Sequence, residues 1–485
     1  MPHSRLEELF EQAVKLQKEG HYEEAVKIWR AIITVRPDDI PALNNMGIAL
    51  RHLGRIAESE AVLRIGLERA PTSAELWMSL ARTLSHWGVI KEAEEALQKA
   101  VILAPNNPRP AYAMGRFLEE NANPMAAMAA YQTAIDIDEN FAPALMALGL
   151  GWKARGEAGQ SERLLRQAIK ARPHFPPGHF QLAMTLLANG QFEEGWQQFE
   201  WRLAMDGLQI IDPDIPRWEG EPLKGRRLLI RCEQGMCEAI QFARLIKEIK
   251  SGETIFECPP AMRQLFAGSR IADEVIEQGA TIRNADLWIP LLSLPMVLKK
   301  SIDNIQHPKP YLRADPSKLA PWRKRLGSET ISIGIAWQGS SPAHENRARS
   351  IPLAAFAPLA QLPNTTLISL QKGAGRSEIG NVDFPILDMS DEMDEGEGAF
   401  LDTAAIMQSL TMIITVDSAI AHLAGALGRP VRVLTPDAMD WRWASGGTNT
   451  TPWYPSMELY PKGDLDWIDL LQQCRDELGP ILANR

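Results

Sequence analysis

A short polar segment between two apolar runs has the composition of an anion-binding turn. Residues 412–416 are expected to form a strand and residues 419–427 a helix, and Asp417 and Ser418 join them directly. The first amides of a helix have no acceptor within it and lie at the positive end of its dipole. We therefore expect the amides of Ser418 and Ala419 to bind a phosphate group, with Asp417 orienting the loop or the ligand. Asp417 and Ser418 could equally cap the helix, and the two interpretations are compatible.

Cationic and amide side chains follow two other expected strands, 331–337 and 365–370. An ammonium group there would contact the same phosphate, an amide would meet a ribose or a base, and guanidinium groups match phosphate oxygens. Only one of the two arginines is expected to matter, because arginine is common on protein surfaces. The candidates are Gln338, Arg347 and Arg349 after the first strand, and Gln371 and Lys372 after the second.

Ring side chains near this turn have two interpretations each. His422 lies one turn into the helix, where it would either reach ligand oxygens or pack as a hydrogen-bonded residue among Ala and Leu. Trp441, Trp443, Trp453 and Tyr454 would either stack on a base or a sugar, or form the core of an irregular lobe. For these four rings we favour the core.

Strands and helices alternate through the second half of the chain, which favours parallel sheets covered by helices. Two such α/β units, expected over residues 226–312 and 330–485, predict a cleft at the carboxyl ends of their strands. Segments 207–225, rich in Pro and Gly, and 313–329 are expected to be linkers. The expected strands are 226–232, 254–258, 285–289, 331–337, 365–370, 385–387, 412–416 and 430–434, and the expected helices of the last unit are 353–360, 403–410 and 419–427.

Residues 1–206 contain an internal repeat of 34 residues. Glycines recur at this spacing with Ala122 as the interruption, and prolines follow about 17 residues later with Glu139 as the exception. The pattern predicts a helix, a tight turn, a second helix and a proline that ends it. The glycines are Gly20, Gly54, Gly88, Gly156 and Gly190, and the prolines are Pro37, Pro71, Pro105 and Pro173.

Spacing and residue types of this repeat resemble the tetratricopeptide repeat, in about six copies. Such all-α arrays stack into a superhelix with a groove that holds a protein segment. Alternatively, the repeats only brace the second half of the chain or dimerise it.

Composition excludes several classes of protein. A chain of 485 residues is longer than a single hydrophobic core usually organises. Its contents of 45% apolar and 23% charged residues are ordinary globular values. A net charge of −10 without a basic run disfavours nucleic-acid binding. Four cysteines without a CxxC pair, and apolar runs shorter than the roughly 20 residues of a membrane span, predict a reduced, cytoplasmic protein. The acidic run 388–397 is expected to be a solvated loop; it fits no calcium-binding pattern, and no metal site is expected.

Five stretches carry a more specific resemblance: WEGEPLKGRRLLIRCEQG, GIAWQGSSPAHENRARSIPL, SLQKG, TVDSAIAHLAGALGRPVRVLTPDAMDWRW and TPWYPSM. They resemble bacterial proteins that join tetratricopeptide repeats to a heptosyltransferase-like domain, and the family is similar to flagellin glycosyltransferases. The resemblance implies a GT-B architecture of two Rossmann-like domains, the first for the acceptor and the second for a nucleotide-sugar donor, which is the substrate. It implies no metal or other cofactor, a donor phosphate at the DSAIAH run, and a protein acceptor such as flagellin in the repeat groove.

The same resemblance places a general base in the loop EQGMCEAIQF. Relatives read Glu-Gln-Gly-Leu-Gly-Asp there, and the aspartate takes the acceptor proton, but this chain has Cys237 for the second glycine and Glu238 for the aspartate. Glutamate keeps the carboxylate, although a displacement of about 1 Å can lower a rate on the order of 100-fold. A positive φ in relatives would leave Cys237 strained. Glu238, with Glu233 as substitute, is the candidate base; otherwise Glu238 only complements a helix dipole.

Three functions stay open at this point. The chain is a glycosyltransferase that modifies a protein selected by the repeats, or a transferase for a lipid-linked or saccharide acceptor whose repeats serve assembly with partners. Alternatively, the changes at Cys237 and Glu238 have removed catalysis, and the chain is a scaffold that still binds a nucleotide.

Overall fold

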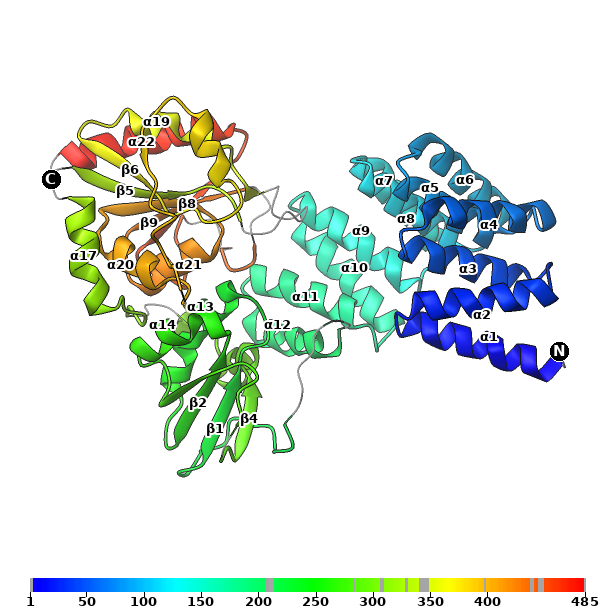
Figure 1. Ribbon diagram of the computed structural model, residues 1–485, viewed down its shortest axis with the longest axis horizontal. Coiled ribbons are helices and arrows are strands. Elements are labelled where there is room, and N and C mark those ends of the chain that lie inside the picture. Colours follow the sequence, from blue (N-terminus) through cyan, green and yellow to red (C-terminus); the bar gives the residue numbers. More distant parts are fainter. Residues whose placement is uncertain are drawn as a thin grey trace. The chain divides into compact units, whose positions relative to one another are not determined.

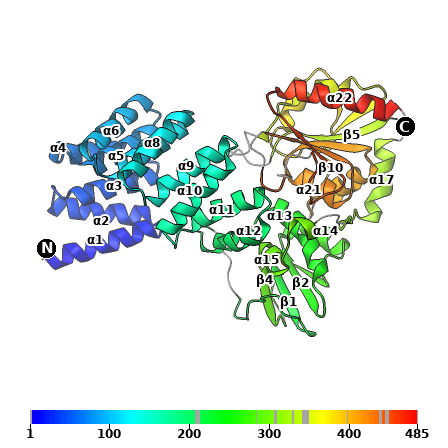
Figure 2. The same ribbon diagram turned by 180° about the vertical axis from the view of Figure 1, so that it is seen from behind.

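The computed structural model describes residues 3–205, 207, 213–282, 284–305, 309–327, 330–339, 349–396, 398–436, 440–443 and 449–483. The chain forms two compact units, Met1–Gln181 and Leu182–Arg485 (Figures 1 and 2). The first is all helical, and the second contains two parallel sheets. No helix among the described residues is both long and apolar enough to cross a bilayer.

Antiparallel helix pairs build the repeat region, as the 34-residue period predicts. The expected turn glycines all have left-handed φ values of 73–82°. Ala122, the exception in the pattern, has φ 56°, so it keeps the same turn without a glycine. The helices are α1 (His3–Lys18), α2 (Tyr22–Val35), α3 (Ile40–His52), α4 (Ile56–Arg69), α5 (Ala74–His86), α6 (Ile90–Leu103), α7 (Pro108–Glu120), α8 (Pro124–Ile137), α9 (Ala142–Ala154), α10 (Ala158–Ala171), α11 (Pro176–Ala188) and α12 (Phe192–Phe199).

The sixth helix pair is shared unequally between the units, because the division falls within α11 and not at residue 206. Helix α12 and the following 3-10 helix η1 (Glu200–Ala204) pack into the α/β unit. Trp196 of α12 is buried, donates through Nε1 to the carbonyl of Lys300 at 2.9 Å, and lies 5.5 Å from the ring of Trp441. The last repeat is therefore part of the second core.

The first sheet has the strand order β3-β2-β1-β4, and all its pairs are parallel. Strand β3 was not expected from its charged sequence, EVIE, because it lies at an edge with half-exposed side chains. The elements of this part are β1 (Arg227–Arg231), α13 (Met236–Ala243), η2 (Arg244–Glu248), β2 (Glu253–Cys258), η3 (Pro260–Met262), α14 (Arg263–Gly268), β3 (Glu274–Glu277), β4 (Leu287–Pro290), η4 (Leu291–Ser293), α15 (Leu294–Val297) and α16 (Ile302–Ile305).

The second sheet has the order β10-β9-β8-β5-β6-β7 and is also parallel. Helices α19 and α22 cover one face, and α20 and α21 cover the other (Figure 1). Strand β10, MELYP, was not expected. The elements are α17 (Pro316–Leu326), β5 (Ile331–Ala336), η5 (Leu353–Phe356), α19 (Ala357–Ala360), β6 (Thr365–Ser369), η6 (Arg376–Asn381), β7 (Ile386–Leu387), α20 (Leu401–Ser409), β8 (Met412–Val416), α21 (Ala419–Ala426), β9 (Val431–Thr435), β10 (Met457–Pro461) and α22 (Trp467–Ala483).

Both expected linkers contain ordered structure that packs on the α/β unit. In the first, the amide of Trp218 donates to the carbonyl of Trp288 in β4 at 2.8 Å, and the Trp218 ring is buried. In the second, α17 docks on α20 through Asp402, which accepts from Lys318 Nζ at 2.8 Å and from Trp322 Nε1 at 2.6 Å. Because each segment buries a tryptophan against the α/β unit, neither is a flexible connection.

Candidate functional site

A cavity of about 700 Å³ lies where the carboxyl ends of both parallel sheets meet within the second unit. The first sheet contributes the start of α13, η3, α14 and the end of β3 to its walls. The second contributes the ends of β5 and β6, the segment before α20, and the start of α21. Its volume is in the range of small-molecule sites, and the crevice beyond strand carboxyl ends is where open α/β sheets bind ligands.

The amino end of α21 opens into this cavity. Ser418, Ala419 and Ile420 line it, and Ser418 takes the N-cap position with an extended backbone. The Ser418 side chain makes no capping hydrogen bond; its Oγ lies 3.4 Å from Oγ1 of Thr415. Ser418 therefore leaves the first amides of the helix for a ligand, as an anion site requires.

Asp417 lies beside that helix start but is turned toward a cation. Its Oδ2 is 3.5 Å from Nη1 of Arg349, and its side chain is 14% exposed. Burial raises the pKa of the Asp417 carboxyl, and the nearby charge of Asp440 acts in the same direction. Arg349 is thus placed near the anion site by a carboxylate neighbour, whereas Arg347 lies outside the described residues.

The strand-end residues Gln338, Gln371 and Lys372 all line the cavity, but protein groups already bind their side chains. Gln371 is buried; its Oε1 accepts from the amides of residues 337 and 338 at 3.0 and 3.1 Å, and its Nε2 donates to the carbonyls of residues 338 and 374. The side-chain amide of Gln371 thus links the ends of β5 and β6, and each of its two ends already makes two hydrogen bonds. The structure therefore does not favour the expected contact of Gln371 with a ribose or a base.

The side chains of Gln338 and Lys372 donate hydrogen bonds to neighbouring loops. Gln338 Nε2 donates to Glu378, which in turn accepts from the Leu353 amide at 2.8 Å. The Lys372 ammonium donates to the carbonyls of Met393 and Asp394, the latter at 3.0 Å. Lys372 therefore fixes the cavity wall before α20 in this structure.

The acidic run is held, within the described residues, by donors that lie outside it in the sequence. Arg376 binds Asp388 at 3.0 Å and Asp391 through both Nη atoms at 2.5 Å, and Asp394 accepts from the Asp402 amide at the start of α20. The expectation of a solvated loop is thus only half right. No group of metal-ligating side chains occurs in the described part of the chain.

Glu238 belongs to a charge cluster at the contact of α13 with the segment after β9. Its Oε1 accepts from Arg442 Nη2 at 2.7 Å, and Arg442 also binds Asp440 at 2.9 Å and Gln241 at 2.9 Å. Among the described residues, no hydrogen bond reaches Oε2 of Glu238. One oxygen of the carboxylate thus remains for an acceptor hydroxyl, although Glu238 itself does not line the cavity.

The departure at Cys237 introduces no backbone strain. Cys237 lies in the first turn of α13 and is not one of the described residues with positive φ. Burial raises the pKa of its thiol to about 12, and the charges of Glu238 and Asp417 add to that shift. The thiol therefore stays protonated at neutral pH, which excludes a thiolate nucleophile under those conditions.

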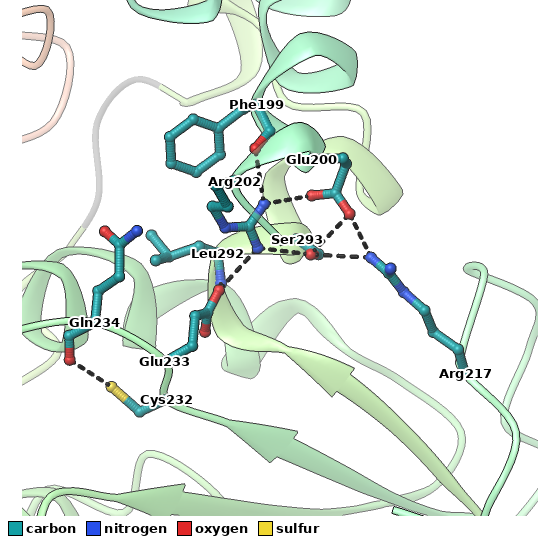
Figure 3. A network of polar contacts seen from close by, with 9 residues as sticks. All are labelled: Phe199, Glu200, Arg202, Arg217, Cys232, Glu233, Gln234, Leu292 and Ser293. Carbon is teal, nitrogen blue, oxygen red and sulfur yellow. Dashed lines mark hydrogen bonds and ion pairs between the residues drawn. The ribbon is translucent and has the colours of Figure 1, made fainter. Parts of the chain in front are cut away.

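Glu233 has a structural task (Figure 3). Its Oε1 accepts from Arg202 Nη2 at 2.8 Å and from the Leu292 amide at 3.1 Å, and burial raises its pKa. Arg202 also binds Glu200 at 2.7 Å and Ser293 at 2.8 Å. This network ties η1 to the loop before α13, and the Glu233 side chain is only 1% exposed, so the geometry gives no support to it as a substitute base.

His422 and the aromatic cluster are core residues. His422 is 1% exposed, its Nδ1 is 3.0 Å from the Tyr454 hydroxyl, and its ring stacks on Trp443 at 4.8 Å. Burial lowers the His422 pKa to about 3, so the ring is neutral at physiological pH. Trp441 and Trp453 are buried too. These rings therefore fit the interpretation as packed core residues. The burial of His422 does not fit a direct contact with a donor.

Sequence reasoning placed the acceptor side at the loop 233–242, which contains the cavity-lining Met236, but it missed Arg263, Gln264 and Glu277 in the same wall. Arg263 begins α14, and Glu277 ends the unexpected strand β3. The signal that could have found Glu277 is position alone, because it ends a strand beside β2 in a parallel sheet.

Comparison with known proteins agrees with the repeat region. The model of the tetratricopeptide repeat family matches residues 10–74 and 44–108. Together with the helix pairs, this match shows that the chain contains tetratricopeptide repeats followed by an α/β region with parallel sheets.

Individual relatives cover different parts of the chain. The protein FlbA of Caulobacter vibrioides is 26% identical over 472 residues, 90% of this chain and 72% of FlbA. The human tetratricopeptide repeat protein 7A is 34% identical over 61 residues, which are 13% of this chain and 7% of that protein. Among solved structures, the repeat protein TTC0263 of Thermus thermophilus is 16% identical with a TM-score of 0.34, covering 38% of this chain and 99% of its own. PilF of Pseudomonas aeruginosa is 20% identical with a TM-score of 0.33, covering 36% and 79%.

Proposed function

We propose that this chain is a glycosyltransferase that moves a sugar from a nucleotide-activated donor to a protein held by its repeats. The observation that carries the proposal is the cavity between the carboxyl ends of two parallel sheets, with the uncapped start of α21 in its wall. A departing phosphate gains negative charge as the sugar leaves, and fixed amide dipoles stabilise that charge. Two Rossmann-like domains facing across such a cavity are the GT-B plan that the sequence resembles.

The proposed chemistry uses the start of α21, which lines the cavity, and Glu238, which lies on α13 two residues after the cavity-lining Met236. The hydroxyl oxygen of the acceptor forms a bond to the anomeric carbon, and the bond from that carbon to the donor phosphate oxygen breaks with its electron pair going to phosphate. The amides of Ala419 and Ile420 receive the anion, with Arg349 beside them. Glu238 takes the hydroxyl proton through its free oxygen, while Arg442 holds the other oxygen. No step requires a metal ion.

The repeats support a protein acceptor, because stacked repeats bury their own core and leave a long surface for a polypeptide. The resemblance makes flagellin the first acceptor to test. The alignment with FlbA covers 90% of this chain, so it includes residues of both the repeats and the α/β region.

A transfer assay tests the proposal. Purified full-length chain, flagellin and radiolabelled uridine, adenosine or cytidine nucleotide sugars should give labelled flagellin in at least one combination. The expected product is a covalently labelled acceptor together with the free nucleotide. Measurable nucleotide binding with no incorporation from any donor into flagellin or a lipid-linked acceptor would reject the enzyme.

That negative result would favour a second candidate function, a scaffold that binds nucleotide without catalysis. The observation in its favour is the ion pair between Glu238 and Arg442, since a guanidinium already occupies one oxygen of the carboxylate. Steady-state turnover separates the two candidates.

A further inference from the structure

A cavity of about 730 Å³ lies at the first sheet, on the edge opposite the candidate site. Its walls come from residues 246–254, which lead from η2 into β2, and from residues 267–275, which lead from the end of α14 into β3. The candidate site faces the carboxyl ends of β2 and β3, whereas this cavity lies at their amino ends, and we call it the basal cavity. None of the described residues lines both cavities.

Four cationic side chains lie in or beside the basal cavity. Lys247 and Arg270 line it. Lys250 Nζ donates to the carbonyl of Lys247 at 3.1 Å. Ser269 connects Lys247 with Arg313, because its carbonyl accepts from Lys247 Nζ at 3.4 Å and its Oγ accepts from the Arg313 amide at 2.9 Å. Three separate segments of the chain thus bring four positive charges to one place.

No carboxylate of the described residues forms an ion pair with any of these four cations, and the contacts of Lys247 and Lys250 are with carbonyls. Asp273 lines the same cavity, but its Oδ2 accepts from the amide and the hydroxyl of Thr254 at 2.8 and 2.9 Å. Within this part of the chain, the positive charge of the basal cavity is therefore not compensated by an ion pair.

The cations of the basal cavity repel one another. Partial burial lowers the pKa of the Lys247 ammonium, and the charge of Arg313 lowers it further. The whole chain has a net charge of −10, so this concentration of cations does not follow from its composition. An anion bound among them would offset the repulsion and would be held by charge-assisted hydrogen bonds.

The composition of the cavity indicates the kind of anion. Guanidinium and ammonium groups bind phosphate, and several cations at one place match a group with more than one negative charge. The remaining wall is mainly apolar and includes Ile246, Ile249, Ile271 and Val275, which suits an apolar or ring-bearing body attached to that group. A membrane surface fits less well, because none of the exposed large apolar side chains of the described residues lines this cavity.

We propose that the basal cavity binds the phosphate or diphosphate group of a small soluble molecule, with Lys247, Arg270 and Arg313 around the anion and the apolar wall against the rest of the molecule. This site is additional to the phosphate site at the start of α21, since it is built from other residues at the other edge of the first sheet. The inference goes beyond the proposed function and does not depend on sugar transfer.

Isothermal titration calorimetry of the full-length chain with inorganic pyrophosphate tests this. Lys247→Gln/Arg270→Gln should weaken pyrophosphate binding at the basal cavity at least about tenfold, because it removes two charged donors. Both residues are exposed, so the double variant should keep the fold and the melting temperature of the unmodified chain. Arg313→Gln alone should weaken the binding in the same direction.

A variant of the proposed donor site separates the two phosphate sites. Proline at position 419 removes one amide from the start of α21 and leaves the basal cavity as it is. Ala419→Pro should therefore retain the binding event that Lys247→Gln/Arg270→Gln loses, whether or not the chain transfers sugar. Loss of all pyrophosphate binding in Ala419→Pro would overturn the proposal, because it would place the anion at α21 alone.

The matched control is Lys299→Gln/Arg323→Gln, which removes two exposed cations of the same unit that line neither cavity. It changes the net charge by the same amount and should leave pyrophosphate affinity unchanged. Equal losses in the two double variants, or an isotherm that Lys247→Gln/Arg270→Gln does not alter, would reject the site. Binding to phosphatidylglycerol vesicles that depends on Lys247 and Arg270, without pyrophosphate binding there, would also overturn the proposal and assign the cations to a membrane surface.

Discussion

Glu238 has one carboxylate oxygen bound to Arg442 and one without a hydrogen bond from the described residues. If that second oxygen takes the acceptor proton, Glu238→Gln should lower turnover by about 100-fold or more and leave donor affinity unchanged, because the amide keeps the contact with Arg442 and loses the basicity. Turnover from the transfer assay and nucleotide affinity from calorimetry measure the two effects.

Asp440→Asn is the control for that change, since Asp440 is the other carboxylate on Arg442. It disturbs the same cluster without removing the proposed base, so its turnover should exceed that of Glu238→Gln. Equal turnover in the two variants would show that Glu238 only holds the cluster together.

The buried His422 is expected to make the stability of the chain depend on pH. Its pKa is about 3 in the folded chain and 6.5 when unfolded, so the unfolded state takes up a proton first as the pH falls. The stabilisation is complete above pH 6.5 and is lost progressively between pH 6.5 and about 3. From pH 7.5 to 5 the loss should be about 2 kcal/mol.

Thermal melts of the full-length chain and of His422→Gln at several pH values measure this slope. The variant should have a lower melting temperature at pH 7.5, because it disturbs the stack on Trp443, but a flatter dependence on pH. A slope equal to that of the unmodified chain would assign the acid sensitivity to other groups.

At the scale of elements, the start of α21 is the feature on which donor binding depends. Proline at the first helical position removes an N–H and keeps the helix. Ser418 precedes that position with φ −158° and ψ 174°, the extended backbone that proline requires before it. Ala419→Pro should therefore keep the fold and weaken nucleotide binding by about tenfold.

The same substitution in a helix of the first unit provides the control. Ala74 starts α5 after the extended Ser73, so Ala74→Pro makes an equivalent change far along the sequence from the cavity residues. It should leave nucleotide affinity as it is. If Ala419→Pro also binds nucleotide normally, the first amide of α21 is not part of the phosphate site.

Elements with strong local signals could be predicted from sequence, and elements defined by distant partners could not. Strand β8 and helix α21 follow from a fully buried apolar run and an Ala-rich run, and the repeat turns follow from Gly at left-handed φ. Ala122 shows where the pattern is incomplete, because the packing of its helix pair imposes the turn on a residue that does not favour it. Edge strand β3 lacked the apolar signal altogether.

The residues of the candidate site also divide into features that the sequence could predict and features that it could not. Position at a strand end placed Ser418, Gln338, Gln371 and Lys372 in one wall, as expected for a parallel sheet. Which of their polar atoms are free depends on partners such as the carbonyl of Met393, and no spacing in the sequence reveals that contact. The pairing of Arg202 with Glu233 is equally long-range, so the sequence did not reveal that an arginine binds this candidate base.

At the scale of the whole molecule, α12 and η1 belong to the second unit and are held in it by a buried aromatic core and a buried ion pair. Trp196 packs on Phe242 and Trp441, and Arg202 neutralises Glu233. A fragment that begins at Gly207 loses both. Removing one partner of a buried ion pair typically costs about 3–5 kcal/mol, and deleting a buried tryptophan side chain costs about as much.

We therefore expect fragment 173–485, which keeps α11, α12 and η1, to fold and to bind nucleotide as the full-length chain does. Fragment 207–485 should aggregate or melt at a much lower temperature, and Arg202→Met in the full-length chain should reproduce part of that loss. Circular dichroism melts and nucleotide calorimetry on the three proteins measure the difference. Equal stability of the two fragments would mean that α12 is an independent repeat, and it would support the expected domain boundary at residue 206.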